Sequence, residues 1–186
     1  MATALIRFTS NSSKQTQPAW GVLFDGHIAP LEGTYETTSD VLRHGLQKAK
    51  ALTAADATIP SSSIHILSPI TTNQQFVCQG INYVDHIRES GLDPAHIPFN
   101  TIFTKASSCL SGPYDDVVCP SHVKLLDYEI ELGAIVCHDV APDTPAVAAQ
   151  EAIGGFVLVN DISARDTQWD EYRNGVFGPV IKAKTF

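Results

Sequence analysis

Glu129 and Glu131, separated by one residue, are the side chains whose types and spacing point most directly to chemistry. On a β-strand, residues i and i+2 project from the same face, so their carboxylates would stand side by side, with Tyr128 and Ile130 on the other face. Like charges this close raise each other's pKa unless a cation lies between them. A third acid, Asp161, ends another apolar run. Three carboxylates that converge from strands predict an oxygen-rich site for Mg²⁺ or Mn²⁺, the alternative being the solvated face of an amphipathic strand.

His86 and Glu89 form a second candidate pair, three residues apart. If the segment after Tyr83 is helical, the two side chains share a face. A carboxylate beside an imidazole orients the ring and stabilises its protonated form, which a base that takes a proton from water requires. Gly80 would allow a tight turn into this segment, and Gly91 with the following prolines suggests a mobile lid. The alternative is an ordinary surface pair on a helix.

A third group of polar side chains follows Asp161: Arg165, Gln168 and Tyr172 are separated by three and four residues. A helical turn after Asp161 would point all three in one direction. Their donors could hold the carboxylate or carbonyl oxygens of a ligand near the proposed metal. Alternatively, Arg165 forms a structural salt bridge with Asp166.

Composition limits the classes of partner and compartment. The chain has 186 residues, 44% apolar content and a net charge of -8, which argues against nucleic acid or an anionic membrane as the main partner. The four cysteines have neither metal-finger nor CxxC spacing, so we interpret them as reduced thiols. No apolar stretch approaches the ~20 residues of a membrane span. We therefore expect a soluble, cytoplasmic protein.

Residues 1–72 are predicted to form a small N-terminal α+β domain. The first 24 residues lack acids, as transit peptides do, but the strand-like runs at 4–8 and 20–24 favour a folded hairpin. A helix is expected near Asp40 to Leu52, with Ser39 as its N-cap. A further strand is expected at 64–67.

Residues 73–186 are predicted to form a second, catalytic domain. Short apolar runs at 76–78, 101–103, 117–118, 128–136 and 156–159 predict strands separated by turns. One helix is expected between them, with Thr144 as its cap, Pro145 in its first turn, and Gly154 and Gly155 at its end. The predicted fold class is therefore α+β and mostly β.

Four motifs, in this order, resemble the fumarylacetoacetate hydrolase family. They are GINYVDH at 80–86, YEIEL at 128–132, VNDISARDTQWDEY at 159–172 and AKTF at 183–186. The resemblance extends from about Phe76 to Phe186, and the N-terminal unit suits the small leading domain of the family. It implies a mixed β-sandwich roll. Because family members continue for roughly another hundred residues, the resemblance also implies that this chain is truncated at its C-terminus and lacks part of the roll.

The resemblance also implies roles for residues at matching positions. Glu129, Glu131 and Asp161 would bind Mg²⁺ or Mn²⁺, with Ca²⁺ able to replace them in a structure. His86, paired with Glu89, would activate water, and Lys184 would be the catalytic lysine beside the metal. The substrate would contact a set of five residues, namely Tyr83, Lys105, Arg165, Gln168 and Tyr172.

The implied function is hydrolysis of a carbon–carbon bond in a β-diketone acid of the acylpyruvate, fumarylpyruvate or fumarylacetoacetate type, through a metal-bound enolate. The partners would be a small 2-oxo or diketo acid and a second copy in a homodimer, with no nucleic acid or membrane. Three alternatives remain open: a 2-oxo acid decarboxylase, a 2-hydroxydienoate hydratase or isomerase, and a non-catalytic truncated family member.

Overall fold

The structure is a computed structural model of the chain, and it describes residues 3–11, 17–97, 100–176 and 182–185. These residues group into two compact units. The first unit comprises residues 1–74, 110–116 and 132–158, and the second comprises residues 75–109, 117–131 and 159–186. The main break in the chain thus falls between residues 74 and 75, while two later segments belong with the N-terminal unit.

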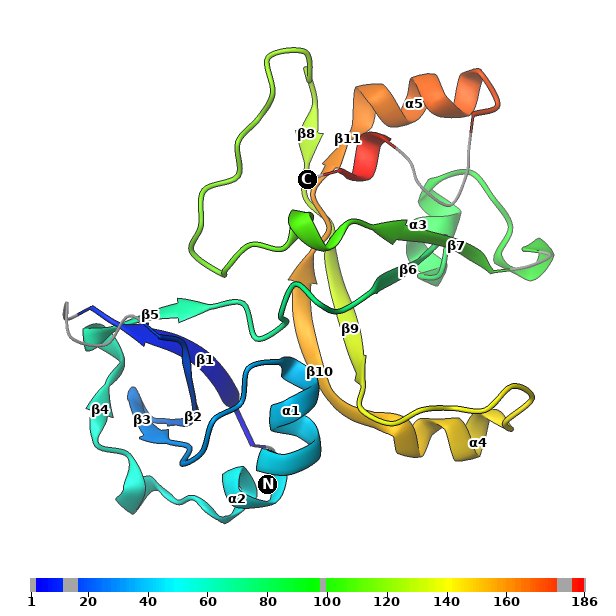
Figure 1. Cartoon of the computed structure of the whole chain (residues 1–186). Helices are drawn as coiled ribbons and strands as arrows, with labels where there is room; N and C mark the ends of the chain where they lie inside the picture. Colours follow the sequence, from blue (N-terminus) through cyan, green and yellow to red (C-terminus); the bar gives the residue numbers. More distant parts are fainter. Residues whose placement is uncertain (1–2, 12–16, 98–99, 177–181, 186) are drawn as a thin grey trace. The chain divides into compact units, whose positions relative to one another are not determined.

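The first unit contains an antiparallel five-stranded sheet in the order β4-β3-β2-β1-β5 (Figure 1). Its strands are β1 (Leu5–Ser10), β2 (Ala19–Phe24), β3 (His27–Pro30), β4 (Ile59–Pro60) and β5 (Ile64–Leu67). Asp25 and Gly26, both with positive φ, connect β2 to β3, as a two-residue hairpin turn requires. The N-terminal segment is therefore paired in a sheet, as its apolar runs predict.

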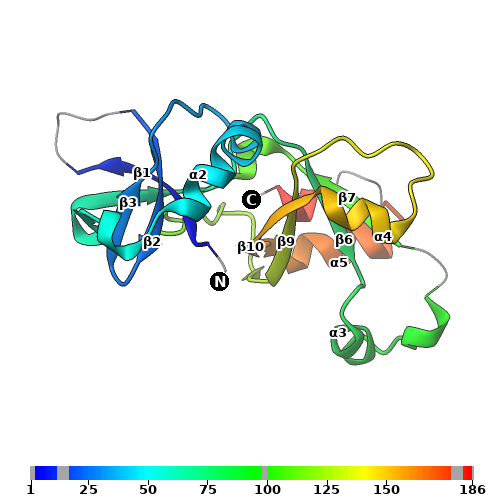
Figure 2. The same ribbon diagram turned by 90° about the horizontal axis from the view of Figure 1, so that it is seen from below.

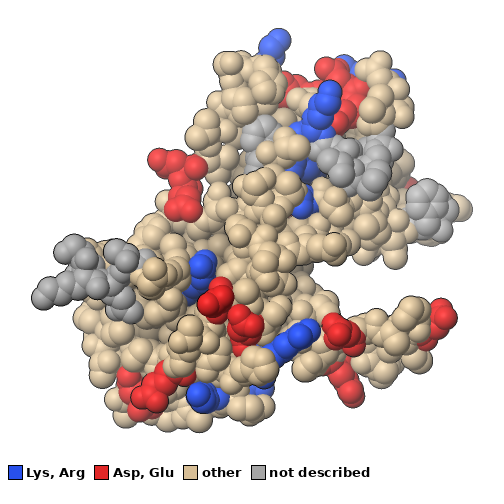
Figure 3. All heavy atoms as spheres, viewed as in Figure 1, with Lys and Arg blue, Asp and Glu red and all other residues tan. Residues whose placement is uncertain are grey.

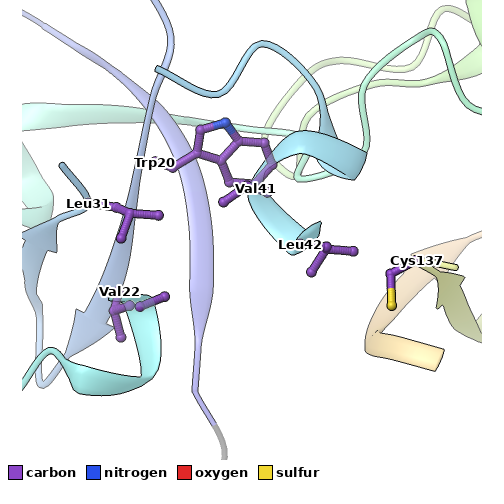
Figure 4. Close-up of a cluster of buried hydrophobic side chains, with 7 residues drawn as sticks. Trp20, Val22, Leu31, Val41, Leu42 and Cys137 are labelled. Carbon is purple, nitrogen blue, oxygen red and sulfur yellow. The ribbon is translucent and has the colours of Figure 1, made fainter. Parts of the chain in front are cut away.

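The helix of this unit begins earlier than the sequence suggests. It runs through α1 (Thr38–Asp40), a π-helical turn (Val41–Gly45) and α2 (Leu46–Ala51). The expected cap at Ser39 is wrong, because Thr37 and Asp40 form a capping box in which each side chain accepts the other's backbone N–H. The buried side chains of this helix pack against the sheet in one cluster, shown in Figure 4: Trp20, Val22, Leu31, Val41, Leu42, Ala49 and Cys137.

Phe8, Ile28 and Ile64 form a second buried cluster. Adjacent strand residues point to opposite faces, so these side chains lie on the other face of the sheet from Trp20 and Val22. With apolar side chains on both faces, the sheet supplies the core of the first unit.

Strands β9 (Ile130–Val136) and β10 (Ile153–Asn160) pair with each other. The predicted helix before β10 is shorter than expected: α4 spans Ala146–Ala149, and a 3₁₀ turn follows at Gln150–Ala152. Gly154 lies inside β10 rather than at the helix end. A Cβ atom at residue 154 would lie 2.8 Å from the Cβ of Cys137. The glycine is therefore required because its backbone packs closely against the Cys137 side chain, and not as a helix cap.

In its described residues, the second unit contains two small sheets and two helices. Strands β6 (Phe76–Gly80) and β7 (Thr101–Lys105) pair antiparallel, and α3 (Val84–Glu89) lies in the connection between them. Strand β8 (Leu126–Asp127) pairs with β11 (Ser163–Ala164), which leads into α5 (Arg165–Arg173). The expected strand at 117–118 is absent from this described segment. Short 3₁₀ turns complete the structure at Ala54–Asp56, Ser61–Ser63, Pro94–His96, Ser107–Cys109 and Lys182–Lys184.

The predicted class, α+β and mostly β, is confirmed by these elements. In the ranges that the structure describes, no helix is long and apolar enough to cross a membrane. On the face shown in Figure 3, acidic and basic side chains lie beside one another in the region of β8, β11 and α5. The candidate site lies among these elements of the second unit.

Candidate active site

The candidate site is built around the sheltered carboxylates of Glu129 and Asp161. Their backbones are tied together, because Asp161 N donates to Glu129 O at 2.8 Å and Glu129 N donates to the Asn160 side chain at 3.1 Å. Glu129 exposes 20% and Asp161 9% of the side chain, whereas Tyr128 and Ile130 are 70% and 64% exposed. The strand expected at 128–136 begins only at Ile130, so Glu129 directly precedes β9 and Asp161 directly follows β10. Both acids are nevertheless sheltered, which is the reverse of a solvated face.

Two lysine ammonium groups approach these carboxylates. Lys184 Nζ donates to Glu129 Oε2 at 2.7 Å, to Asp161 Oδ2 at 2.9 Å and to Ser163 Oγ at 2.6 Å. Lys105 Nζ donates to Asp161 Oδ1 at 2.7 Å. Both lysine side chains are more than nine-tenths buried. Buried charges of opposite sign are thus paired by short hydrogen bonds, and each oxygen of Asp161 has its own cation.

Arg165 contacts the far side of Glu129. Its Nη1 lies 2.6 Å from Glu129 Oε1 and donates to Gln168 Oε1 at 2.9 Å, while its Nε donates to Asp127 Oδ2 at 2.9 Å. Burial alone would lower the pKa of Arg165, but the contacts with Asp127 and Glu129 raise it overall. The guanidinium is therefore fully charged and engaged by side chains of the protein itself.

Glu131 is the third acid of the cluster and differs from the other two. In the described part of the chain, no ammonium or guanidinium group forms an ion pair with it. Burial raises its pKa, the charges of Glu129 and Asp161 raise it further, and a hydrogen bond from Tyr83 opposes this rise. The negative charge of Glu131 is thus unfavourable in the metal-free protein, and a cation nearby would relieve it.

Two other groups are affected by this cluster. Burial, followed by the charge of Asp161, raises the pKa of the Cys78 thiol to about 11, so the thiol is protonated at neutral pH. Burial and then the charge of Glu129 raise the pKa of Tyr172. Cys78, Tyr83 and Tyr172 therefore lie close to the carboxylates, although the tyrosines remain partly exposed.

The fit of a divalent cation rests on the chemistry of the donors and on Lys184. Among the described residues, no three Asp, Glu, His or Cys side chains converge closely enough to coordinate a metal ion. However, Glu129 Oε2 and Asp161 Oδ2 already face one shared cation, the Lys184 ammonium. These are the hard oxygen ligands that Mg²⁺ and Mn²⁺ prefer, and Glu131 adds a carboxylate without a cation. The residues fit such an ion in type, and two of the three also fit in direction.

His86 and Glu89 lie on α3 as the spacing predicts, but both are exposed. In the described residues, no hydrogen bond or ion pair joins them to each other or to the three acids. Figures 1 and 2 both show α3 apart from α5, and Figure 2 shows it projecting from the β6–β7 hairpin. The structure thus brings nine of the eleven predicted site residues into one cluster and leaves this pair outside it.

Two residues of the cluster were not predicted from the sequence. Ser163 is fully buried and donates to Asp161 O at 2.9 Å, and it lies 3.2 Å from Glu129 Oε1. Asp127 binds Arg165. The signal that could have found them is the i, i+2 spacing, because Asp127 precedes Glu129 by two residues and Ser163 follows Asp161 by two.

Comparison with known proteins identifies the family of this chain. The family model of the fumarylacetoacetate (FAA) hydrolase C-terminal region matches residues 75–186, which is more than half of the chain. The chain therefore belongs to the fumarylacetoacetate hydrolase family, and the resemblance seen in its motifs is confirmed.

Two curated relatives show the extent of the similarity. The chain is 38% identical over 126 residues to human mitochondrial oxaloacetate tautomerase FAHD2A, which covers 68% of this chain and 38% of that protein. It is 34% identical over 183 residues to mitochondrial oxaloacetate tautomerase fahd2 of Xenopus laevis, covering 94% of this chain and 56% of that protein. The chain thus spans little more than half, or less, of the length of these curated relatives.

Solved structures show the same fold. Fumarylacetoacetate hydrolase from Exiguobacterium antarcticum superposes with a TM-score of 0.74 and 25% identity, covering all of this chain and 62% of that chain. A 2-hydroxyhepta-2,4-diene-1,7-dioate isomerase from Mycobacterium marinum superposes with a TM-score of 0.66 and 20% identity. The predicted fold of the family is therefore confirmed over the part that this chain represents.

Proposed function

We propose that this chain carries the reaction centre of an enzyme that interconverts the keto and enol forms of a dicarboxylic 2-oxo acid such as oxaloacetate. The observation that carries the proposal is a pair of buried ammonium groups, Lys105 and Lys184, at sheltered carboxylates, while His86 and Glu89 stand outside. Such a centre can stabilise an enolate without activating water. The names of the FAHD2A and fahd2 relatives support the same reaction.

The proton shift moves one hydrogen from C3 of the substrate to the oxygen on C2. The three N–H bonds of Lys184 are donated to Glu129, Asp161 and Ser163. Lys184 would therefore act as a fixed positive charge near that oxygen as negative charge develops on it, which needs little reorganisation. Lys105 would hold Asp161 in place, and Arg165 would do the same for Glu129. Mg²⁺ or Mn²⁺ held by Glu129, Glu131 and Asp161 would supply Lewis-acid polarisation of the 2-oxo acid.

Hydrolysis of a β-diketone acid is the second candidate. His86 and Glu89 occupy one helix, three residues apart, as a water-activating pair requires. This reaction needs α3 to approach the carboxylates, so it depends on a rearrangement of the second unit. The decarboxylase and hydratase or isomerase alternatives use the same enolate chemistry and remain predictions, as do the homodimer and the cytoplasmic location.

An assay of the purified chain distinguishes these reactions. The enol form of oxaloacetate absorbs in the ultraviolet, so its conversion can be followed directly, and acylpyruvate cleavage can be followed in parallel with and without Mg²⁺ or Mn²⁺. We expect enol conversion that falls at least tenfold in Lys184→Met and is unchanged in His86→Ala. Lys182→Met, which alters an exposed lysine of the same turn, is the matched control.

Two results would contradict the proposal. Cleavage of acylpyruvate that is lost in His86→Ala, together with a wild-type chain that shows no enol conversion, would favour the hydrolase. Absence of both activities in a folded chain that binds no Mn²⁺ would favour the non-catalytic alternative.

A further inference from the structure

Asp127 is an acid that neither the motifs nor the proposed reaction uses, yet it contacts the candidate site through Arg165. We propose that Asp127 is a positioning residue, which fixes the Arg165 guanidinium so that Glu129 and Gln168 keep one orientation each. This inference rests on the proposed function, because it assumes that Glu129 belongs to the reaction centre.

The contacts of Arg165 show how the orientation is set. One edge of the guanidinium is bound, since Nε donates to Asp127 Oδ2 at 2.9 Å. The other end then reaches two acceptors, with Nη1 at 2.6 Å from Glu129 Oε1 and 2.9 Å from Gln168 Oε1. Because a guanidinium is planar and rigid, fixing its Nε also fixes the direction of Nη1.

The backbone holds both ends of this ion pair. Asp127 on β8 pairs with Ser163 on β11, and Arg165 N donates to Leu125 O at 2.8 Å. Asp127 Oδ1 also accepts the N–H of Tyr128 at 2.9 Å, so the carboxylate cannot rotate without losing a second bond.

The consequence for Glu129 is that its two oxygens have different tasks. Oε1 is taken by Arg165, and Oε2 faces Lys184 at 2.7 Å on the side shared with Asp161. Without Asp127, Nε would lose its acceptor, and the direction of Nη1 would be set only by Glu129 and Gln168 themselves. Glu129 would keep Lys184 on Oε2, but its Oε1 would have a less well fixed donor, so the orientation of the carboxylate would be less well defined. Partners that orient metal ligands typically contribute 10–100-fold to metal affinity or activity.

The simpler explanation is that Asp127 and Arg165 only attach β8 to α5. That explanation predicts a loss of stability with no change in cation affinity. A second acid provides the matched control: Asp166 accepts the N–H of Lys124 at 2.9 Å, so it also anchors the segment before β8 to α5. Asp166, however, forms no ion pair with Arg165 in the described residues.

The test compares Asp127→Asn, Asp127→Glu and Asp166→Asn in the purified chain. Mn²⁺ affinity is measured by calorimetry and by the electron paramagnetic resonance signal of free Mn²⁺, melting temperature by circular dichroism, and kcat and KM with oxaloacetate. We expect Asp127→Asn to weaken Mn²⁺ binding about 10-fold or more and to lower kcat more than it raises KM. Asp127→Glu should recover part of both, and Asp166→Asn should lower the melting temperature alone.

The failure of this inference differs from the failure of the proposed function. Wild-type chain that binds Mn²⁺, together with an Asp127→Asn variant whose affinity lies within twofold of it, would overturn the positioning role alone. A folded wild-type chain with neither Mn²⁺ binding nor enol conversion would overturn the proposed function, and the positioning role with it.

Discussion

Replacing Lys184 by methionine tests the charge balance of the candidate site most directly. Methionine keeps much of the length and apolar stem of lysine but removes the ammonium group. The change breaks contacts with two sheltered carboxylates, Glu129 and Asp161, and with the buried hydroxyl of Ser163. Removing one partner of a buried ion pair usually costs about 3–5 kcal/mol, because the remaining charge stays buried without compensation.

The structure places the expected cost at the lower end of this range. Asp161 keeps Lys105 on its Oδ1, and Glu129 keeps Arg165 on its Oε1, so neither carboxylate loses its last cation. We therefore expect the free energy of unfolding to fall by about 3 kcal/mol at pH 7.5. Since single domains are commonly stable by about 5–15 kcal/mol, the variant should still fold.

The effect of an added cation provides a second measure of the same charge balance. Because Lys184→Met leaves the buried carboxylates with one cation fewer, Mn²⁺ should stabilise the variant more than the wild type.

Urea unfolding followed by circular dichroism at pH 7.5, with and without Mn²⁺, measures these differences, and Lys182→Met is the control. A deficit below about 1 kcal/mol, or one that Mn²⁺ leaves unchanged, would refute the reasoning that Lys184 compensates buried charge.

Three further predictions concern the same chain. Glu131→Gln should stabilise the metal-free protein slightly at pH 7.5, by under about 1 kcal/mol. The raised folded-state pKa of Glu131 makes the wild type lose stability as pH rises, and the variant should lack this loss. Urea unfolding in the presence of a chelator measures both effects. Cys78, whose thiol pKa is raised to about 11, should react with iodoacetamide at pH 8 far more slowly than exposed Cys119, and equal rates in the folded chain, determined by peptide mass mapping, would contradict the burial. Thr38→Val should cost about 1–3 kcal/mol in urea unfolding, because the buried N–H of Thr71 loses its acceptor, whereas an unchanged midpoint would mean that water replaces the hydroxyl.

The helices show where local sequence information is sufficient and where it is not. Helix α5 follows Asp161 and α3 follows Tyr83 as the spacing of polar residues predicts. The predicted helix end at Gly154 is wrong, because this glycine lies in β10 and allows close packing against Cys137. Gly154 and Cys137 are 17 positions apart in the sequence, so a local sequence pattern cannot predict their contact.

The sequence by itself determined the family, the class of fold and the identity of the three acids. These depend on residue types at short, fixed spacings, and the alternation of a strand carries that information directly. The tertiary structure decided which of the alternating side chains are sheltered from solvent, and which lysine and arginine side chains contact the acids. Lys105 and Lys184 reach Asp161 across 56 and 23 residues, and only folding brings such distant charges within hydrogen-bonding distance. It also separated His86 from the site, because its helix lies in the β6–β7 connection, whereas the acids lie at the start of β9 and directly after β10.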